Sequence, residues 1–185
     1  MCERKRIVHL QKSNSASVVY DWAHSLIFAL AVVLIILTFF VRLVDVKGDS
    51  MNNTLFTGDK VIVTNFFYQP KTDDIVVISH GVNYFEPIIK RVIATEGQTL
   101  DIDFENQIIK VDGKVLDQPY AYGYTDRKDA EIPKVIPEGK VFVLGDNRIV
   151  SSDSRSTDIG LIEEDDIIGK AQLVIFPFNS FQYLG

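Results

Sequence analysis

The chain has 185 residues, 46% of them hydrophobic, which allows one domain with its own core and one accessory segment. Its formal net charge of -6 argues against nucleic acid as a partner, because binding to phosphates needs a basic surface. The single cysteine, Cys2, excludes an intrachain disulfide. The three histidines are scattered without a metal-binding spacing, so we expect neither a metal nor a cofactor.

A long apolar segment near the N-terminus is the first predicted element. Residues 22–44 read WAHSLIFALAVVLIILTFFVRLV, and a helix of this length, at about 1.5 Å per residue, covers the hydrocarbon core of a bilayer. A cleaved secretory signal is disfavoured because the residues at the end of the segment, where cleavage would occur, have large side chains. A buried core helix is disfavoured because the segment has no polar face. The sequence predicts residues 1–20 as a tail, 21–44 as a transmembrane helix and 45–185 as a separate domain.

The charges on either side of this segment predict its orientation. Arg4, Lys5, Arg6 and Lys12 precede it, whereas residues 42–49 contain two basic and two acidic side chains. Because basic residues favour the cytoplasmic side, the N-terminus is predicted to be cytoplasmic. The chain is therefore expected to cross the cell membrane once, with residues 45–185 outside the cytoplasm.

Short β-branched runs separated by turn residues follow the span. They lie at residues 60–68, 75–79, 88–95, 99–104, 107–111, 140–144 and 168–176. Between two of these segments, Asp112 and Gly113 predict a type I′ hairpin turn. The predicted fold is mainly β: an N-terminal transmembrane helix followed by an all-β domain of short antiparallel strands.

Ser50 lies in a short turn, Gly48-Asp49-Ser50, soon after the span. A serine that follows such residues is usually only a turn residue. No histidine is close to it in the sequence. If Ser50 is a nucleophile, its base would be a lysine kept neutral by burial.

Lys90 is the lysine that best fits this requirement. In an extended strand its side chain shares a face with Ile88, Val92 and Ala94, and Arg91 points to the opposite face. A base that works near pH 7 needs a pKa roughly three pH units below the usual 10.4, which apolar surroundings can cause. An edge-strand lysine that prevents aggregation explains the strand pattern equally well.

A third polar cluster, GDNRIVSSDSR at residues 145–155, follows the apolar run at 140–144. Its glycine, hydroxyls and paired charges indicate a loop that crosslinks itself at the end of a strand. Taken alone, this segment is better explained as a solvated polar loop.

Taken together and in this order, these segments resemble the type I signal peptidases, serine–lysine proteases that remove signal peptides from exported proteins. The resemblance covers the span and then GDSMNNTL, GDKVIV, KRVIATEGQTL and GDNRIVSSDSR. Each motif is weakly specific, but their joint order is highly specific. The short stretch between the last two motifs resembles the single-span Gram-positive type.

The resemblance implies a mechanism without histidine. Ser50 would attack the peptide carbonyl and form an acyl-enzyme, and Lys90 would act as the general base. Ser151 would hydrogen-bond Lys90 and orient it. The expected substrates are the signal peptides of secretory preproteins, and the other expected partner is the lipid bilayer.

The resemblance also implies structural and substrate-binding residues. Arg91 with Asp146, and Asp153 with Arg155, would form ion pairs. A shallow apolar pocket would accept alanine-like residues at the first and third positions before the cut. The residues expected to line this pocket are Val44, Val46, Met51, Leu55 and Ile89.

Two positions depart from the family pattern. Asn53 stands where the family usually has proline before Thr54, which is expected to loosen the turn without changing the chemistry. Gly48 stands where some members have a serine that stabilises the oxyanion. Stabilisation would then depend mainly on the backbone N–H of Ser50.

Two other functions fit parts of the sequence. A catalytically inactive, membrane-anchored β domain that binds partners is disfavoured by the presence of both Lys90 and Ser151. A self-cleaving serine–lysine protease of the repressor type would be soluble and would bind DNA. The apolar span and the acidic net charge disfavour that second function.

Overall fold

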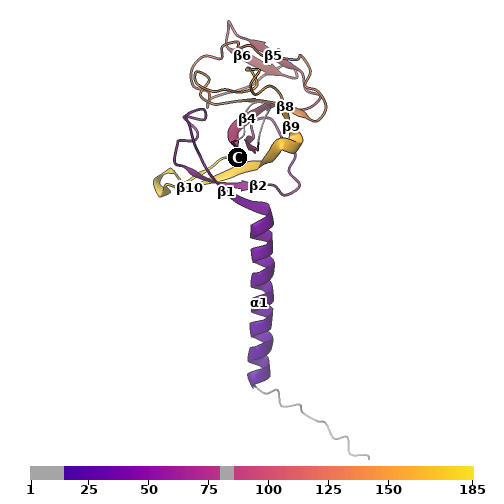
Figure 1. Cartoon of the computed structure of the whole chain (residues 1–185), viewed down its shortest axis with the longest axis vertical. Helices are drawn as coiled ribbons and strands as arrows, with labels where there is room; N and C mark the ends of the chain where they lie inside the picture. The colour runs from indigo at the N-terminus through magenta and orange to yellow at the C-terminus, as the bar shows by residue number, and fades with distance from the viewer. Residues whose placement is uncertain (1–14, 80–85) are drawn as a thin grey trace, which may run out of the picture. The chain divides into compact units, whose positions relative to one another are not determined.

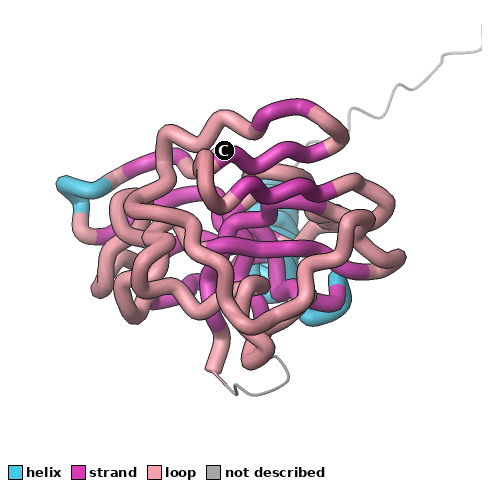
Figure 2. Tube along the Cα trace, turned by 90° about the horizontal axis from the view of Figure 1, so that it is seen from above, coloured by secondary structure: helices cyan, strands magenta, loops and turns pink. Residues whose placement is uncertain are grey.

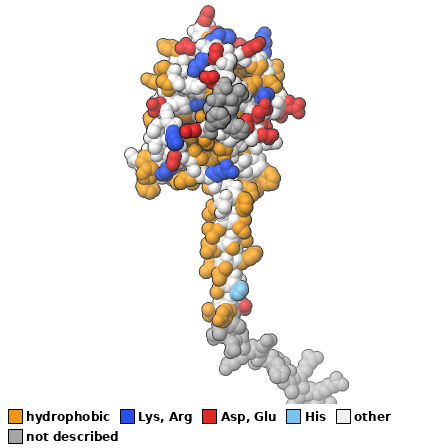
Figure 3. Space-filling model, in the orientation of Figure 1, with side chains coloured by type: hydrophobic (Ala, Val, Ile, Leu, Met, Phe, Trp, Pro, Cys, Tyr) orange, Lys and Arg blue, Asp and Glu red, His pale blue; other side chains and the backbone are white. Residues whose placement is uncertain are grey.

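The computed structural model describes residues 15–79 and 86–185, and the chain divides into two units, residues 1–39 and 40–185. Helix α1, Ser15–Phe40, contains a stretch from Val18 that is long and apolar enough to cross a membrane (Figure 1). None of that stretch is buried within the chain, and Figure 3 shows mostly hydrophobic side chains along the helix. The helix is therefore not a buried core helix.

The bounds of this helix differ from the predicted ones. It begins at Ser15, so part of the predicted tail is helical, and it ends at Phe40 rather than at Val44. The apolar residues that follow form strand β1, Val41–Asp45, which pairs antiparallel with β2, Lys60–Thr64. Pairing with a strand distant in sequence decides the helix end, and valines favour extended structure.

The larger sheet of the β domain is antiparallel, in the order β1-β2-β10-β3-β4-β8-β9, and β11 pairs with β10. Figure 2 shows strands of the domain, in magenta, lying side by side. Its other strands are β3 (Ile75–Ile78), β4 (Ile88–Ala94), β8 (Lys140–Leu144), β9 (Ile162–Glu163), β10 (Ile167–Phe176) and β11 (Gln182–Tyr183). Two 3-10 helices flank β10: η1, Glu164–Asp166, and η2, Phe178–Ser180.

A smaller antiparallel sheet contains β5 (Leu100–Asp103), β6 (Ile108–Val111) and β7 (Lys114–Val115). Asp112 and Gly113 connect β6 to β7 with positive φ angles of 51° and 73°, as a type I′ turn requires. The fold is thus mainly antiparallel β with one N-terminal apolar helix, and the predicted fold class is confirmed.

The hydrophobic core positions the turn that carries Ser50. Met51 and Leu55 are buried in a cluster with valines of β2 and residues of β10. The N–H of Leu55 donates to the carbonyl of Met51 at 2.8 Å, so residues 51–55 form a compact turn. Ser50 is therefore held at the surface by two side chains that are fixed in the core.

Candidate active site

Ser50 lies in the turn after β1, and its backbone is fixed from the loop that follows β8. Asn147 donates its N–H to the Ser50 carbonyl at 3.0 Å and its side-chain amide to the Asp49 carbonyl at 3.1 Å. These two bonds join segments that are almost one hundred residues apart in sequence. They leave the Ser50 hydroxyl free to face β4.

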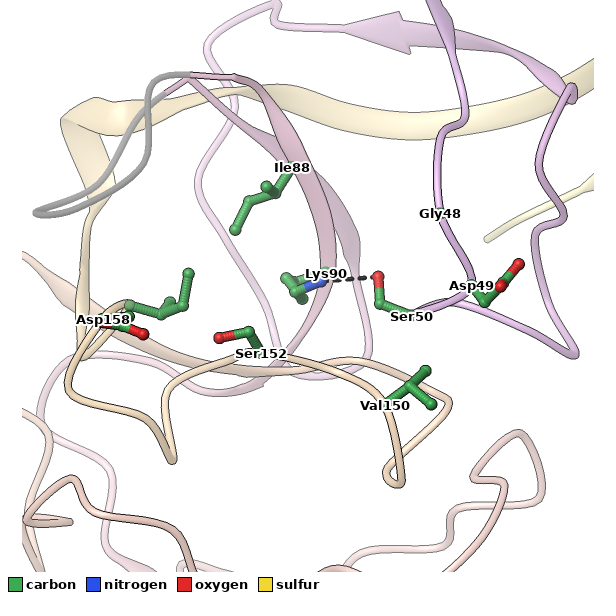
Figure 4. Close-up of a pocket in the computed structure, with 9 residues that line it drawn as sticks. Gly48, Asp49, Ser50, Ile88, Lys90, Val150, Ser152 and Asp158 are labelled. Carbon is green, nitrogen blue, oxygen red and sulfur yellow. Dashed lines mark hydrogen bonds between the residues drawn. The ribbon is translucent and has the colours of Figure 1, made fainter.

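Lys90 lies in β4 with its Nζ 2.8 Å from the Ser50 Oγ (Figure 4). Lys90 is buried, with 4% of its surface exposed. Ile88 and Val92 pack in one core cluster, as the alternation predicts, but Ala94 packs with Ile93 in another. The reason is a shift in pairing with β8 between Val92 and Ala94, which interrupts the alternation.

Burial lowers the pKa of Lys90 to about 8, because the charged amine loses its hydration. The charge of Lys128 also lowers this pKa, whereas the carboxylates of Asp153 and Asp146 raise it. At pH 7, a pKa of about 8 leaves roughly a tenth of the molecules with a neutral amine. A neutral amine 2.8 Å from a hydroxyl has a lone pair that can accept its proton.

Arg91 points away from Lys90 and binds Asp146 through two hydrogen bonds, of 2.8 and 2.7 Å. Thr54, in the turn after Ser50, donates its hydroxyl to the same carboxylate. Tyr120 lies under the guanidinium, 3.7 Å from it, and donates its hydroxyl to Asp73. Asp146 thus joins the Ser50 turn to the strand that carries Lys90.

Asp153 and Arg155 form a second ion pair, in which both side chains are fully buried. Although burial raises the pKa of Asp153, the Arg155 guanidinium outweighs this effect and holds that pKa below its usual value. Arg155 also donates to the backbone carbonyl of Arg148, and Asp153 accepts the N–H of Gly145. The polar loop is therefore a buried, crosslinked segment and not a solvated one.

Ser151 lies close to the pair but does not hydrogen-bond Lys90. Its hydroxyl is 3.4 Å from the Ser152 carbonyl and also contributes to the lowered pKa of Asp153. Within the described chain, the side-chain hydrogen bond of Lys90 goes to Ser50. The arrangement implied by the resemblance for Ser151 is thus replaced by one in which that hydroxyl faces the buried carboxylate.

Several residues of this network were not predicted. Arg148 is buried and donates to the Gly145 carbonyl, to Thr125 and to Gln118, while Lys128 donates to the Ser151 carbonyl. Apart from the basic residue types themselves, the sequence contains no signal for these contacts. The long connection between β7 and β8 has no repeating pattern that would show which of its residues turn inward.

Gly145 is another position whose importance is visible only in the structure. A Cβ atom there would lie 2.2 Å from the Ser151 hydroxyl and 2.5 Å from the Ser50 carbonyl oxygen. No side chain fits at these distances without moving one of the two serines. The loop approaches the Ser50 turn this closely because residue 145 has no side chain.

Two hollows adjoin the Ser50–Lys90 pair, and Ile88 also lines both. The first hollow, of about 590 Å³, extends toward Val150, Ser152, Asp158 and Ile159. The second, of about 550 Å³, extends between β1 and the start of β4. Of the residues expected to form the apolar pocket, Val44 and Ile89 line the second hollow, whereas Val46, Met51 and Leu55 are buried in the core and line neither.

The reactive groups of the site point to proton transfer. In residues 15–79 and 86–185, no group of three or more His, Cys, Asp or Glu side chains is arranged to hold a metal ion. The reactive atoms are a hydroxyl and a buried amine within hydrogen-bonding distance. This pairing is suited to nucleophilic attack by the serine with the lysine as base.

Comparison with known proteins gives a consistent result. The family model described as signal peptidase, peptidase S26, matches residues 19–176. Signal peptidase IB of Staphylococcus aureus strain MRSA252 is 36% identical over 183 residues, covering 88% of this chain and 92% of that protein. Signal peptidase I of Bacillus amyloliquefaciens is 32% identical over 185 residues, covering 93% and 91%. A crystal structure of a signal peptidase I from Enterococcus faecalis V583 aligns with 56% of this chain and 97% of its own, at 23% identity and a TM-score of 0.45.

The chain therefore belongs to the signal peptidase family, peptidase S26. It is a membrane-anchored serine endopeptidase that cleaves signal peptides from exported preproteins. Nothing in these matches favours an inactive binding module.

Proposed function

We propose that Ser50 is the nucleophile of this peptidase and Lys90 its general base. The observation that carries the proposal is the 2.8 Å distance between the Ser50 Oγ and the Nζ of a buried lysine. Neutral Lys90 takes the proton of Ser50 as Oγ attacks the scissile carbonyl carbon, and then passes this proton to the leaving amine. In the second half of the reaction, Lys90 removes a proton from the water that hydrolyses the acyl-enzyme ester.

The charge that develops on the carbonyl oxygen needs a hydrogen-bond donor. The backbone N–H of Ser50 is available, since no described residue accepts a hydrogen bond from it. Gly48 precedes it in the left-handed region, with a φ of 82°, and provides no hydroxyl. The Ser50 N–H is therefore the donor that we assign to the oxyanion.

The free edges of β1 and β4 support binding of the substrate as an extended strand. β1 is the terminal strand of the large sheet, and β4 pairs with β8 only from Arg91 onward. Residues 88–90 therefore pair with β3 alone among the described strands. The second hollow lies between these two edges, so a peptide can add to them and place its scissile bond at Ser50.

Substrate specificity tests this arrangement. Replacing alanine by leucine at the position before the cut in a model preprotein should lower kcat/KM by at least about 100-fold, since the rigid wall around Ile89 leaves no space for a branched side chain. Glycine and serine at this position should be tolerated. Efficient cleavage after leucine in purified enzyme would show that the second hollow does not hold this residue.

The pH dependence of cleavage should report the ionisation of Lys90. The protonated amine cannot act as a base, so kcat/KM should rise with pH and level off above the Lys90 pKa of about 8. The charge of Lys128 lowers the Lys90 pKa. Its removal in Lys128→Gln should therefore move the midpoint of the rise in kcat/KM to higher pH. Profiles of both enzymes, measured with one peptide, check the shift, and a midpoint that stays unchanged or falls would contradict it.

We further propose that the N-terminus is cytoplasmic and that the β domain lies outside the cytoplasm. The basic residues before the span support this orientation. Protease added to intact cells should digest an epitope placed after Gly185 and spare one placed before Met1. Digestion of the N-terminal epitope alone would reverse the orientation.

A further inference from the structure

The first hollow extends from the Ser50–Lys90 pair toward Val150 and Ile159, whereas the proposed binding site for the signal peptide extends from the pair toward β1. Ser50, Ile88 and Lys90 line both hollows, so a peptide that is cut at Ser50 extends from one into the other. If the residues before the cut occupy the second hollow, as proposed above, the residues after the cut enter the first. This inference therefore rests on the proposed function.

The first hollow has an apolar floor and a negatively charged rim. Val150, Ile159 and Ile88 contribute the apolar surface, and Asp49 and Asp158 contribute carboxylates. The proposed mechanism requires a neutral Lys90. The charged side chains among the described residues that line the first hollow are then these two carboxylates. A peptide that enters the first hollow therefore meets a negative potential.

Of the two carboxylates, Asp158 is the one placed to act on the peptide. Figure 4 shows Asp158 and Asp49 on opposite sides of the Ser50–Lys90 pair, with the Asp49 carboxylate directed away from Lys90. Asp158 is exposed, and its carboxylate has no hydrogen bond or ion pair with any described residue. It is therefore available to a ligand.

The turn that carries Asp158 is crosslinked to its surroundings, so the backbone of Asp158 is fixed beside the hollow. Ile159 is buried in the core, and the N–H of Gly160 donates to the Ser156 carbonyl at 2.8 Å. Thr157 binds Asp129 through both its N–H and its hydroxyl. When a peptide binds, only the side-chain torsions of Asp158 need ordering, which limits the entropic cost of using its charge.

We propose that the first hollow binds the first residues of the mature protein, and that Asp158 makes it select a basic over an acidic side chain there. Because Asp158 is exposed, the attraction is screened by salt and its effect is moderate. We expect kcat/KM to be about 5- to 20-fold higher for lysine than for glutamate at the most sensitive of the first three positions after the cut.

The test uses the full-length enzyme in detergent and a set of peptides with one constant signal sequence. Lysine, glutamine and glutamate are placed in turn at each of the first three positions after the cut. The readout is the lysine-to-glutamate ratio of kcat/KM, for the wild type and for Asp158→Asn and Asp158→Lys. The matched control is Asp101→Lys, which changes the net charge equally at an exposed residue of β5 in the smaller sheet.

The proposal predicts that the ratio falls toward one in Asp158→Asn, falls below one in Asp158→Lys and is unchanged in Asp101→Lys. In the wild type, 0.5 M salt should reduce it. A ratio near one in the wild type, or a ratio that does not respond to Asp158, would overturn the inference while leaving the peptidase activity intact. Absence of cleavage for every peptide would instead contradict the proposed function.

Discussion

Replacing either Ser50 or Lys90 by alanine should lower kcat/KM for preprotein cleavage by at least about 10⁴-fold, because nucleophile and base act as a unit. Lys90→Arg should be equally inactive, since arginine keeps its proton at any accessible pH. Removing Lys90 also removes a buried amine that is costly to desolvate, so Lys90→Ala should fold at least as stably as the wild type. Single-turnover assays with purified full-length enzyme measure the effect.

The control for this experiment is Lys140→Ala, which removes a partly exposed lysine that pairs with Glu163 at the far edge of the sheet. It should retain near wild-type activity. Cleavage by Lys90→Ala within about tenfold of the wild type would rule out Lys90 as the base. The double variant Ser50→Ala with Lys90→Ala should be no slower than either single variant.

Asp146→Ala should have the second largest effect, because it acts on both stability and activity. Its carboxylate is fully buried and neutralises Arg91, so its removal leaves a nearly buried guanidinium without its anion. Such losses typically lower the free energy of unfolding by about 3–5 kcal/mol. Urea unfolding of the full-length protein in detergent, followed by cleavage assays well below the midpoint, separates the two effects.

A second variant separates the ion pair from the positioning of Ser50. Thr54→Val removes the hydroxyl that binds Asp146 but keeps the Arg91–Asp146 pair. This variant releases the turn after Ser50. Expressed as free energies, its loss of kcat should therefore be larger than its loss of unfolding stability. Glu163→Ala, which breaks an exposed pair, should lower the free energy of unfolding by less than about 1 kcal/mol. If Asp146→Ala and Glu163→Ala lowered the free energy of unfolding equally, the structural role of Asp146 would be contradicted.

Local sequence signals predicted much of the fold. The hairpin turn at Asp112 and Gly113 was predictable because few residues other than glycine, asparagine and aspartate adopt two successive positive φ angles. The β-branched runs became β2, β3, β4, β5, β6, β8 and β10, because period and composition are properties of each segment alone. The end of α1 was not predictable, because Val41–Asp45 is apolar enough for either state and is made extended by β2.

The candidate site was predictable only as a set of residues and not as a geometry. The order of the motifs singled out Ser50 and Lys90, and the structure places these side chains in contact. The orientation of Ser151 depends on the buried Asp153, and the position of Ala94 depends on a shift between two strands. Tyr120 and Lys128 come from the connection between β7 and β8, which has no periodicity. Such contacts arise from tertiary packing, which spacing along the chain does not specify.

Strand β4 has a further consequence because its pairing changes along its length. Arg91 pairs with both β3 and β8, and the residues after it pair with β8, whereas residues 88–90 have an edge that no described strand covers. Backbone groups along such an edge remain hydrogen-bonded to water in the free protein. An extended peptide that adds there displaces this water, and it also removes water from around the Lys90 amine. Substrate binding and dehydration of the base would then be one event, so the lysine would lose its proton most readily when there is a bond to cut.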